Sequence, residues 1–174
     1  STFNYINADN AQSFGAEMEF RRKLDFAEAL KNFTFQTNIS YIYNRVKKGS
    51  ANIDRPMQGQ SPYVINAALQ YDVEKLGINT TLLFNQIGDR IYYVGGNDIA
   101  PVTEQHRPLL DFQIAKKVIK NTGEIKLNVS DLLNRDNNFY LDVNNNRKYD
   151  GTDLLVIKRK YGATISVSFS YNIK

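Results

Sequence analysis

Residues 163–173 alternate strictly between apolar and polar side chains, and this pattern constrains the fold more than any other. The apolar set is Ala163, Ile165, Val167, Phe169, Tyr171 and Ile173, and the polar set is Thr164, Ser166, Ser168, Ser170 and Asn172. Successive side chains of a strand point to opposite faces, so the segment predicts a strand with one apolar face. Such a strand fits a soluble sandwich, or a barrel wall between lipid and water, which needs roughly 9–11 residues per crossing.

The same two-residue period recurs along the chain. It is found in residues 13–24, 33–44, 63–73, 78–85, 110–115 and 125–130, and the fourth of these segments is expected to extend through Ile91 and Tyr93. The closing strand is expected to begin as early as Leu155 and to bend at Gly162. Together these segments predict an all-β chain of about seven strands.

The connections between these segments alternate in length. Residues 25–32, 74–77 and 121–123 form short turns, whereas residues 46–61, 95–106 and 134–153 form long polar loops. Outer-membrane barrels have short periplasmic turns and longer extracellular loops, and aromatic girdles at both interfaces. Tyr and Phe side chains also gather near the ends of the apolar stripes, although aromatic residues are common in strands generally. The sequence therefore predicts an antiparallel up-and-down transmembrane β-barrel, located in the outer membrane of a Gram-negative bacterium.

An odd number of strands raises a difficulty for this fold. Seven antiparallel strands cannot close on themselves, because the first and the last would run in the same direction. An open edge in lipid would cost several kcal/mol for each unpaired backbone group. Residues 134–153 are where an eighth strand would have to lie, and their Asn and Asp content argues against one. We therefore expect residues 1–174 to be one segment of a larger barrel, in which residues 163–173 pair with residues 124–133 on one side and with a strand outside this sequence on the other.

Composition excludes several other classes of protein. The chain has no Cys, so it has no disulfide and no thiolate metal site. Its net charge of +4 is scattered rather than gathered in a basic stripe with aromatic residues, so no nucleic-acid partner is expected. No run of about 18 apolar residues is present, so a transmembrane helix is not expected. The polar start predicts no signal peptide within these residues.

One loop has the spacing of a calcium-binding loop. The loop spans residues 142–153. Counted from Asp142, oxygen-bearing side chains stand at positions 1, 3, 5, 9 and 12, and the carbonyl group of Lys148 stands at position 7. Ca²⁺ prefers six to eight oxygen ligands at such positions. The loop departs from the EF-hand pattern in having Arg147 where glycine makes the sharp turn, and the shorter Asp at position 12. The alternative is a solvated Asn/Asp-rich surface loop. The calcium ligands that we expect are Asp142, Asn144, Asn146, Asp150 and Asp153.

Other ionisable residues do not form a catalytic constellation. His106 is the one histidine, and no motif places a nucleophile or a second ligand beside it, so we expect a loop residue near the barrel mouth. Glu17 and Glu19 share a face with two basic residues and are expected to form a charge ladder. Further charges expected to line the lumen are Asp72, Asp111, Lys117 and Lys126. We therefore do not expect an enzyme.

Several phrases, in order, resemble the C-terminal part of TonB-dependent outer-membrane transporters. The resemblance covers nearly all of the chain from about Phe14 onward. In that family a Leu-Leu-Asn phrase ends the penultimate strand, and a Tyr/Gly phrase leads into the last one. The phrases are Arg55-Pro-Met-Gln-Gly-Gln-Ser-Pro-Tyr-Val-Ile-Asn66, Gln70-Tyr71, Asn85-Gln-Ile-Gly-Asp-Arg-Ile91, Leu110-Asp111, Asn128-Val-Ser-Asp-Leu-Leu-Asn134 and Tyr161-Gly162-Ala163.

This resemblance implies a barrel of the 22-stranded type, filled by a plug domain that lies outside this sequence. It implies active uptake of a nutrient such as a siderophore, vitamin, glycan or peptide, powered through TonB by way of the plug region. The partners would be the rest of the barrel, the plug, the extracellular nutrient and outer-membrane lipid. We expect the long loops to contribute the nutrient contacts, because binding residues concentrate on loops held by a rigid scaffold.

Two other functions remain open at this point. A self-contained small outer-membrane barrel would need an eighth strand, and a catalytic role would also need a cluster of His, Ser and Asp. A soluble β-sheet module that binds glycans would fold without detergent, because its apolar faces would pack against each other.

Overall fold

The computed structural model describes residues 7–49, 53–96, 99–146 and 148–173, which contain strands and short 3-10 turns but no α-helix. The 3-10 turns are η1 (Glu28–Leu30) and η3 (Glu74–Leu76). The strands are β1 (Asn10–Lys23), β2 (Phe33–Lys48), β3 (Ile53–Arg55), β4 (Tyr63–Val73), β5 (Ile78–Ile87), β6 (Arg90–Tyr93), β7 (Val102–Glu104), β8 (Leu109–Val118), β9 (Gly123–Ser130), β10 (Asn137–Leu141), β11 (Leu154–Arg159) and β12 (Thr164–Tyr171).

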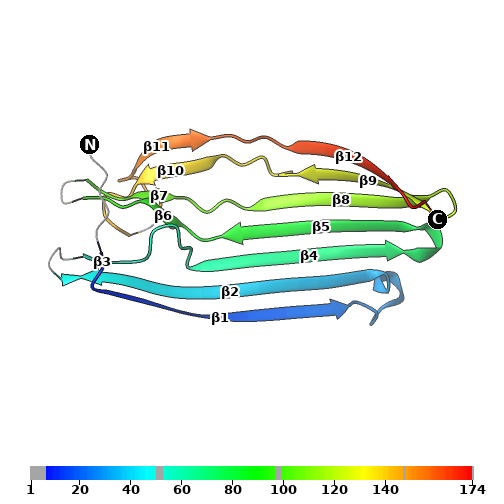
Figure 1. Ribbon diagram of the computed structural model, residues 1–174, viewed down its shortest axis with the longest axis horizontal. Coiled ribbons are helices and arrows are strands. Elements are labelled where there is room, and N and C mark those ends of the chain that lie inside the picture. The colour runs from blue at the N-terminus through cyan, green and yellow to red at the C-terminus, as the bar shows by residue number, and fades with distance from the viewer. Residues whose placement is uncertain (1–6, 50–52, 97–98, 147, 174) are drawn as a thin grey trace.

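Seven long strands form a curved antiparallel sheet, which we call the wall sheet (Figure 1). Their order is β1-β2-β4-β5-β8-β9-β12, and the short β3 pairs with β2 off this path. Consecutive long strands are neighbours throughout, so the prediction of seven antiparallel up-and-down strands is confirmed. The expected pairing of the closing strand is confirmed as well, since Val167 of β12 lies opposite Leu127 of β9.

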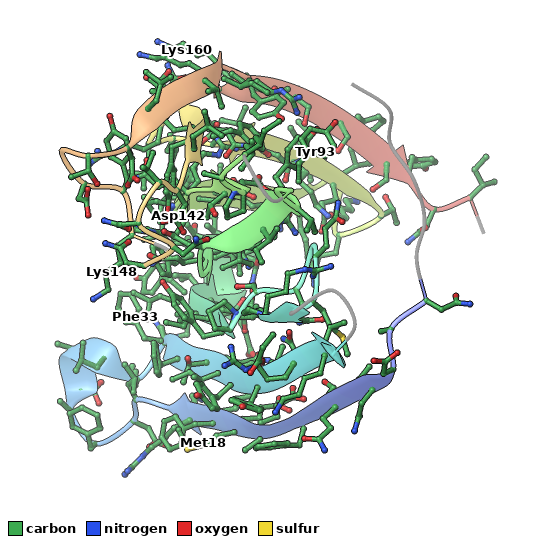
Figure 2. The ribbon with its side chains drawn as sticks, turned by 90° about the vertical axis from the view of Figure 1, so that its left-hand side faces the viewer. Met18, Phe33, Tyr93, Asp142, Lys148 and Lys160 are labelled. Carbon is green, nitrogen blue, oxygen red and sulfur yellow. The ribbon has the colours of Figure 1, made fainter. Side chains whose placement is uncertain are left out.

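The register gathers apolar side chains on one face of the wall sheet. Leu69, Leu82 and Phe112 are direct cross-strand neighbours on β4, β5 and β8. Figure 2 shows that Met18 lies on the outer, convex side of the curve. On β12, Ile165, Val167 and Phe169 are 69%, 70% and 58% exposed. Nothing within the described residues covers this face, whereas a soluble sandwich would bury it against a second sheet.

The two ends of the wall sheet differ. The short connections at 24–32, 74–77 and 119–122 lie together at one end, on the right of Figure 1. Gly77 closes the η3 turn with φ of +59°, and its amide donates a hydrogen bond to the Glu74 carbonyl oxygen. An L side chain adopts that backbone angle only with strain, so glycine suits this turn. The long connections all lie at the other end.

A second, four-stranded sheet stands at the end with the long connections, and we call it the rim sheet. Its order is β11-β10-β7-β6, so it continues the last four strands of the wall sheet beyond their ends. The sequence predicted loops at 46–61, 95–106 and 134–153, but these include β3, β7 and β10. The expectation of a loop without strands in 134–153 was therefore wrong, whereas the expectation that these residues add no eighth strand to the wall is confirmed, because β10 lies in the rim sheet and extends β9.

The fourth predicted strand is interrupted rather than continuous. β5 ends at Ile87, and β6 begins at Arg90 in the rim sheet. The expected bend of the closing strand is confirmed: β11 ends at Arg159, Gly162 has φ of +81°, and β12 begins at Thr164.

The buried apolar residues lie mainly in the rim sheet. Among the described residues they are Ile91, Phe139 and Tyr140 of the rim sheet, together with Ala115 of β8. The molecule thus has its core at one end, while the wall sheet keeps its apolar face outward. None of the helical segments that the structure describes is long and apolar enough to cross a membrane.

β1 and β12 are the two edges of the wall sheet, and each has one neighbour in it. β1 and β12 run in the same direction, because the strands that lie between them, β2, β4, β5, β8 and β9, are odd in number and each is antiparallel to its neighbours (Figure 1). Within the described residues the wall is therefore open, as the strand count predicted.

Candidate functional site

Aromatic and basic side chains pack together on the rim sheet. The Phe139 ring lies 4.6 Å from the Tyr92 ring, and the Arg159 guanidinium carbon lies 4.8 Å from the Phe139 ring centre. Arg159 Nη2 also donates a hydrogen bond of 3.3 Å to the Tyr92 hydroxyl oxygen, which lowers the pKa of Tyr92. Tyr92 contacts Tyr93 edge-on at 4.4 Å. Figure 2 shows Tyr93 on the concave side of the curve, so this cluster borders the space that the wall encloses.

A second aromatic–arginine pair, Arg107 and Tyr161, lies beside the start of β8 and the end of β9. Arg107 Nη1 donates a 2.7 Å hydrogen bond to Asp131 Oδ2 and a 2.9 Å bond to the Arg135 carbonyl oxygen. The Arg107 guanidinium stands 5.2 Å from the centre of the Tyr161 ring. The Asp131 amide in turn donates to Asp111 Oδ1 at 2.8 Å. These bonds tie the Asn128–Asn134 phrase to β8 and to the start of the last strand.

Asp89 organises the junction between the wall and rim sheets. It accepts hydrogen bonds from the His106 amide at 2.7 Å and from the Tyr140 hydroxyl at 3.1 Å, and His106 Nδ1 lies 2.6 Å away. Burial, followed by the charge of Asp89, raises the pKa of Tyr140 far above its ordinary value. His106 therefore lies at the junction of the two sheets and serves as a structural partner of Asp89.

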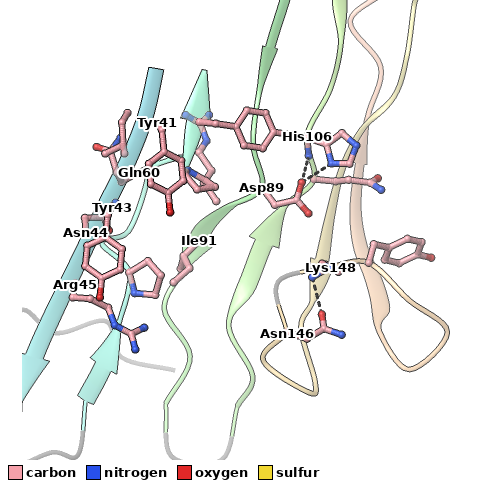
Figure 3. A pocket seen from close by; sticks show the side chains of 17 residues that line it. Tyr41, Tyr43, Asn44, Arg45, Gln60, Asp89, Ile91, His106, Asn146 and Lys148 are labelled. Carbon is pink, nitrogen blue, oxygen red and sulfur yellow. Dashed lines mark hydrogen bonds and ion pairs between the residues drawn. The ribbon is translucent and has the colours of Figure 1, made fainter. Parts of the chain in front are cut away.

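A pocket of about 680 Å³ lies between β2 and this junction. Figure 3 shows Tyr41, Tyr43 and Arg45 of β2 on one side and His106 and Lys148 on the other. The segment 56–62 bridges the two sheets beside it, because the Gly59 amide donates a 2.8 Å bond to the Ile91 carbonyl oxygen. The lining also includes Gln60, Tyr63, Asp89, Arg90, Gln105, Asn146 and Tyr149.

The predicted calcium loop is folded tightly around its own oxygens. The Asn146 amide donates 3.0 Å bonds to Asp142 Oδ1 and Asn144 Oδ1, and the Val143 amide donates a 3.1 Å bond to Asp153 Oδ1. Asp150 Oδ2 accepts from Asn144 Nδ2 at 2.9 Å and from Asn146 Nδ2 at 2.8 Å. The structure thus brings the five predicted ligand residues together in one loop.

Hydrogen bonds within this loop keep one of its carboxylates charged. Hydrogen bonds from Thr152, and then from Asn144 and Asn146, hold the pKa of Asp150 well below its ordinary value, so its carboxylate stays charged. Asp142 is fully buried, and Asp153 bonds two backbone amides. Among the described residues no group of three His, Cys, Asp or Glu side chains is placed to hold a metal, and Arg147 lies outside them. Calcium binding stays a prediction, resting on Asn and carbonyl oxygens as well as carboxylates.

The polar face of the wall sheet carries the residues predicted to line a lumen. Asn38 Nδ2 donates to Glu17, and Asn79 Nδ2 donates to Asp72. Lys126 lies 3.6 Å from Glu124, and Asn85 Nδ2 donates a 2.7 Å bond to Asn66 Oδ1. This face is therefore joined more by amide hydrogen bonds than by the charge ladder that the sequence suggested for Glu17 and Glu19.

Comparison with known proteins identifies the family. The family model that matches the chain describes an outer-membrane protein β-barrel family, and the match spans residues 1–171. The chain belongs to the outer-membrane protein β-barrel family. This outer-membrane β-barrel chain is located in the outer membrane, which overturns the alternative of a soluble glycan-binding module. No curated protein and no solved structure matches it.

Because the outer-membrane β-barrel chain belongs to this family, each face and each end of its wall sheet can be assigned to a side of the barrel or of the membrane. The convex apolar face is the lipid face, and the concave polar face is the lumen face. The end with short turns is periplasmic, and the rim sheet stands at the extracellular end. The aromatic–arginine cluster of the rim sheet therefore borders the mouth of the lumen, whereas the pocket beside Tyr41 and Tyr43 opens elsewhere, on the lipid face.

Sequence reasoning missed the rim sheet and the pocket. Both depend on contacts between distant residues, such as Asp89 with Tyr140, which lie 51 positions apart. One local signal was present: the apolar residues Phe139 and Tyr140 inside a loop rich in Asn and Asp have no role in a solvated loop.

Proposed function

We propose that this chain is the C-terminal part of the barrel of a TonB-dependent transporter for a siderophore, vitamin, glycan or peptide. The observation that carries the proposal is the open wall sheet, whose edge strands β1 and β12 run in the same direction. Unpaired backbone groups in lipid cost several kcal/mol each, so both edges need partner strands. The rest of a larger barrel, of the 22-stranded type that the resemblance implies, would supply those strands.

The proposed role at the mouth is nutrient binding rather than catalysis. Tyr93 and Tyr161 are 43% and 62% exposed, and each stands beside an aromatic–arginine contact. Aromatic rings next to guanidinium groups can hold a sugar or aromatic ligand by stacking and can orient it by hydrogen bonds. The plug and the contact with the TonB complex belong to the parts of the transporter outside this sequence.

Uptake by the intact protein tests the transport proposal. We expect that deleting the gene removes growth on one sole iron or carbon source from a panel, and that deleting TonB removes growth on the same source. A protonophore is expected to stop uptake of that nutrient in wild-type cells, because TonB transmits energy from the proton gradient. Complementation with the wild-type gene is the control. Uptake that survives both the loss of TonB and the protonophore would identify a passive channel instead.

We also propose that the loop of residues 142–153 binds Ca²⁺ at the extracellular end. Hydrogen bonds link its five oxygen-bearing residues within one loop, and the Lys148 carbonyl stands at the seventh position of the spacing. Because Ca²⁺ would bind the folded loop and not the unfolded chain, it should stabilise the rim sheet.

Melting of the purified protein tests this calcium proposal. We expect excess Ca²⁺ to raise the melting temperature by several degrees, as saturation at about 100 times Kd contributes about 2.7 kcal/mol. Asp142→Ala and Asp153→Ala should abolish the shift. Lys148→Ala is the control, because it removes a side chain but keeps the backbone carbonyl group. The same melting temperature of the wild-type protein in Ca²⁺ and in a chelator would refute calcium binding.

A further inference from the structure

The pocket beside β2 opens on the lipid face of the wall and not into the lumen. Tyr41 and Tyr43 alternate along β2 with the same phase as Ile39, and Tyr63 of β4 lies directly opposite Tyr41. Figure 2 shows Lys148 on the same convex side of the curve as Met18. Residues from β2, β4 and the 142–153 loop therefore meet outside the barrel, where they line one pocket.

The pocket lies at the level of the outer lipid headgroups. Phe33 and Tyr43 both face outward and stand ten positions apart on β2. At about 3.3 Å per residue and a tilt of about 40°, that separation spans about 25 Å along the membrane normal, the height of the apolar band of such barrels. Tyr41, Tyr43 and Tyr63 thus occupy the extracellular aromatic girdle. The pocket begins at these rings and extends beyond the band.

Three cationic side chains line the pocket, and two of them are paired with carboxylates that lie outside the lining. Arg45, Arg90 and Lys148 line the pocket, and Asp89 is the carboxylate that lines it. Asp89 is occupied by the His106 amide, the His106 ring and the Tyr140 hydroxyl. The Asp89 carboxylate therefore already has partners at the junction of the wall and rim sheets.

An ion pair with a carboxylate fixes the position of each of the two arginines. Arg45 Nε lies 3.0 Å from Asp54 Oδ1, and Arg90 Nε lies 2.7 Å from Glu104 Oε2. The closest contact of each guanidinium with its carboxylate is made by Nε, so a terminal nitrogen on the other side of the group can meet a further acceptor. Lys148 has no ion-pair partner among the described residues, and a flexible lysine can follow an anion. Pre-positioned arginines of this kind suit a phosphate group.

We propose that this pocket binds the phosphorylated headgroup of an outer-leaflet lipid. The phosphate would lie between Arg45, Arg90 and Lys148, and the first methylene groups of the lipid would contact the rings of Tyr41 and Tyr63. A pocket of about 680 Å³ lies in the range of small-ligand sites and accommodates a headgroup rather than a whole lipid. This site is separate from the lumen and from the proposed nutrient contacts, so it concerns how the barrel is held in its leaflet.

Lipid binding to the purified full-length protein in nonionic detergent tests this assignment. The probe is bisphosphorylated lipid A, compared with the same lipid after removal of its phosphates, and binding is measured by native mass spectrometry. We expect the phosphorylated form to bind at least tenfold more tightly. The double variant Arg45→Gln/Lys148→Gln should lose that preference, while Lys75→Gln, in the short periplasmic turn, should keep it.

Three outcomes would overturn the proposal. The first is equal binding of the two lipid forms, and the second is an unchanged preference in the double variant although its melting temperature matches the wild type. The third is competition by inorganic phosphate at millimolar concentration that abolishes lipid binding, which would identify a site for the free anion.

Discussion

Replacing Leu82 with arginine is expected to weaken folding of the protein into the bilayer by about 2–4 kcal/mol, the cost of a cation near the midplane on the lipid face of a barrel. Leu82 lies in the middle of β5, where its cross-strand neighbours Leu69 and Phe112 also face outward. Its side chain is 38% exposed in the chain, and that exposed part would be in contact with lipid. The loss is measured from denaturant unfolding of the full-length protein in lipid vesicles.

Leu83 offers a closely matched control for this prediction. It is the same residue type, is 41% exposed and is adjacent in β5, but it points to the lumen face. Its register neighbours are Ala68 and Asp111, and Asp111 would favour a nearby cation. Leu83→Arg is therefore expected to cost less than about 1 kcal/mol. Equal losses for the two variants, or a larger loss for Leu83→Arg, would mean that the faces are assigned the wrong way round.

The wall sheet could be predicted from sequence, because contact with lipid on one face and water on the other makes apolar and polar side chains alternate every second residue in each strand by itself. Each side chain of β12 faces one solvent or the other, so the alternation at 164–171 is complete without knowledge of any partner. Strand order then followed from short turns such as the one that ends at Gly77. The open edges also followed, because strand direction depends on the number of strands alone.

The rim sheet could not be predicted in this way, because its strands are short and their partners are distant. Asn137 and Asn138 of β10 suggest a turn when considered locally. Their amides instead donate 3.0 Å hydrogen bonds to Glu104 and Gln105, residues 33 positions earlier. The calcium ligand set, by contrast, is a local pattern, and the structure brings those side chains together, although binding itself stays a prediction.

One part of the pocket on the lipid face could be predicted from local sequence, and the other part depends on contacts between distant residues. Tyr41 and Tyr43 were expected at the ends of the apolar stripes from sequence alone. The cations beside them come from β6 and from the 142–153 loop, and only the fold of the rim sheet brings Arg90 and Lys148 to the same place. A girdle position is thus predictable, whereas the headgroup site above it depends on tertiary structure.

Phe139→Ala is expected to destabilise the rim sheet by about 3–5 kcal/mol, the usual cost of truncating a buried phenylalanine. The ring is 1% exposed and packs between Tyr92 and Arg159, so its removal leaves a cavity in the centre of the rim sheet. Because the rim sheet has its own buried core, the loss should be local: amides of β7 and β10 should exchange hydrogen faster, while those of β4 and β5 stay protected.

Hydrogen exchange of the purified protein measures this effect, and Leu154→Ala is the matched control. Leu154 belongs to β11 of the same sheet but is 60% exposed, so its truncation should change exchange little. If Phe139→Ala also releases the amides of β4 and β5, the wall and rim sheets unfold as one unit. In that case the extracellular end would not be a separate element that can adjust to a ligand, because every change at the mouth would have to be accommodated by the barrel wall.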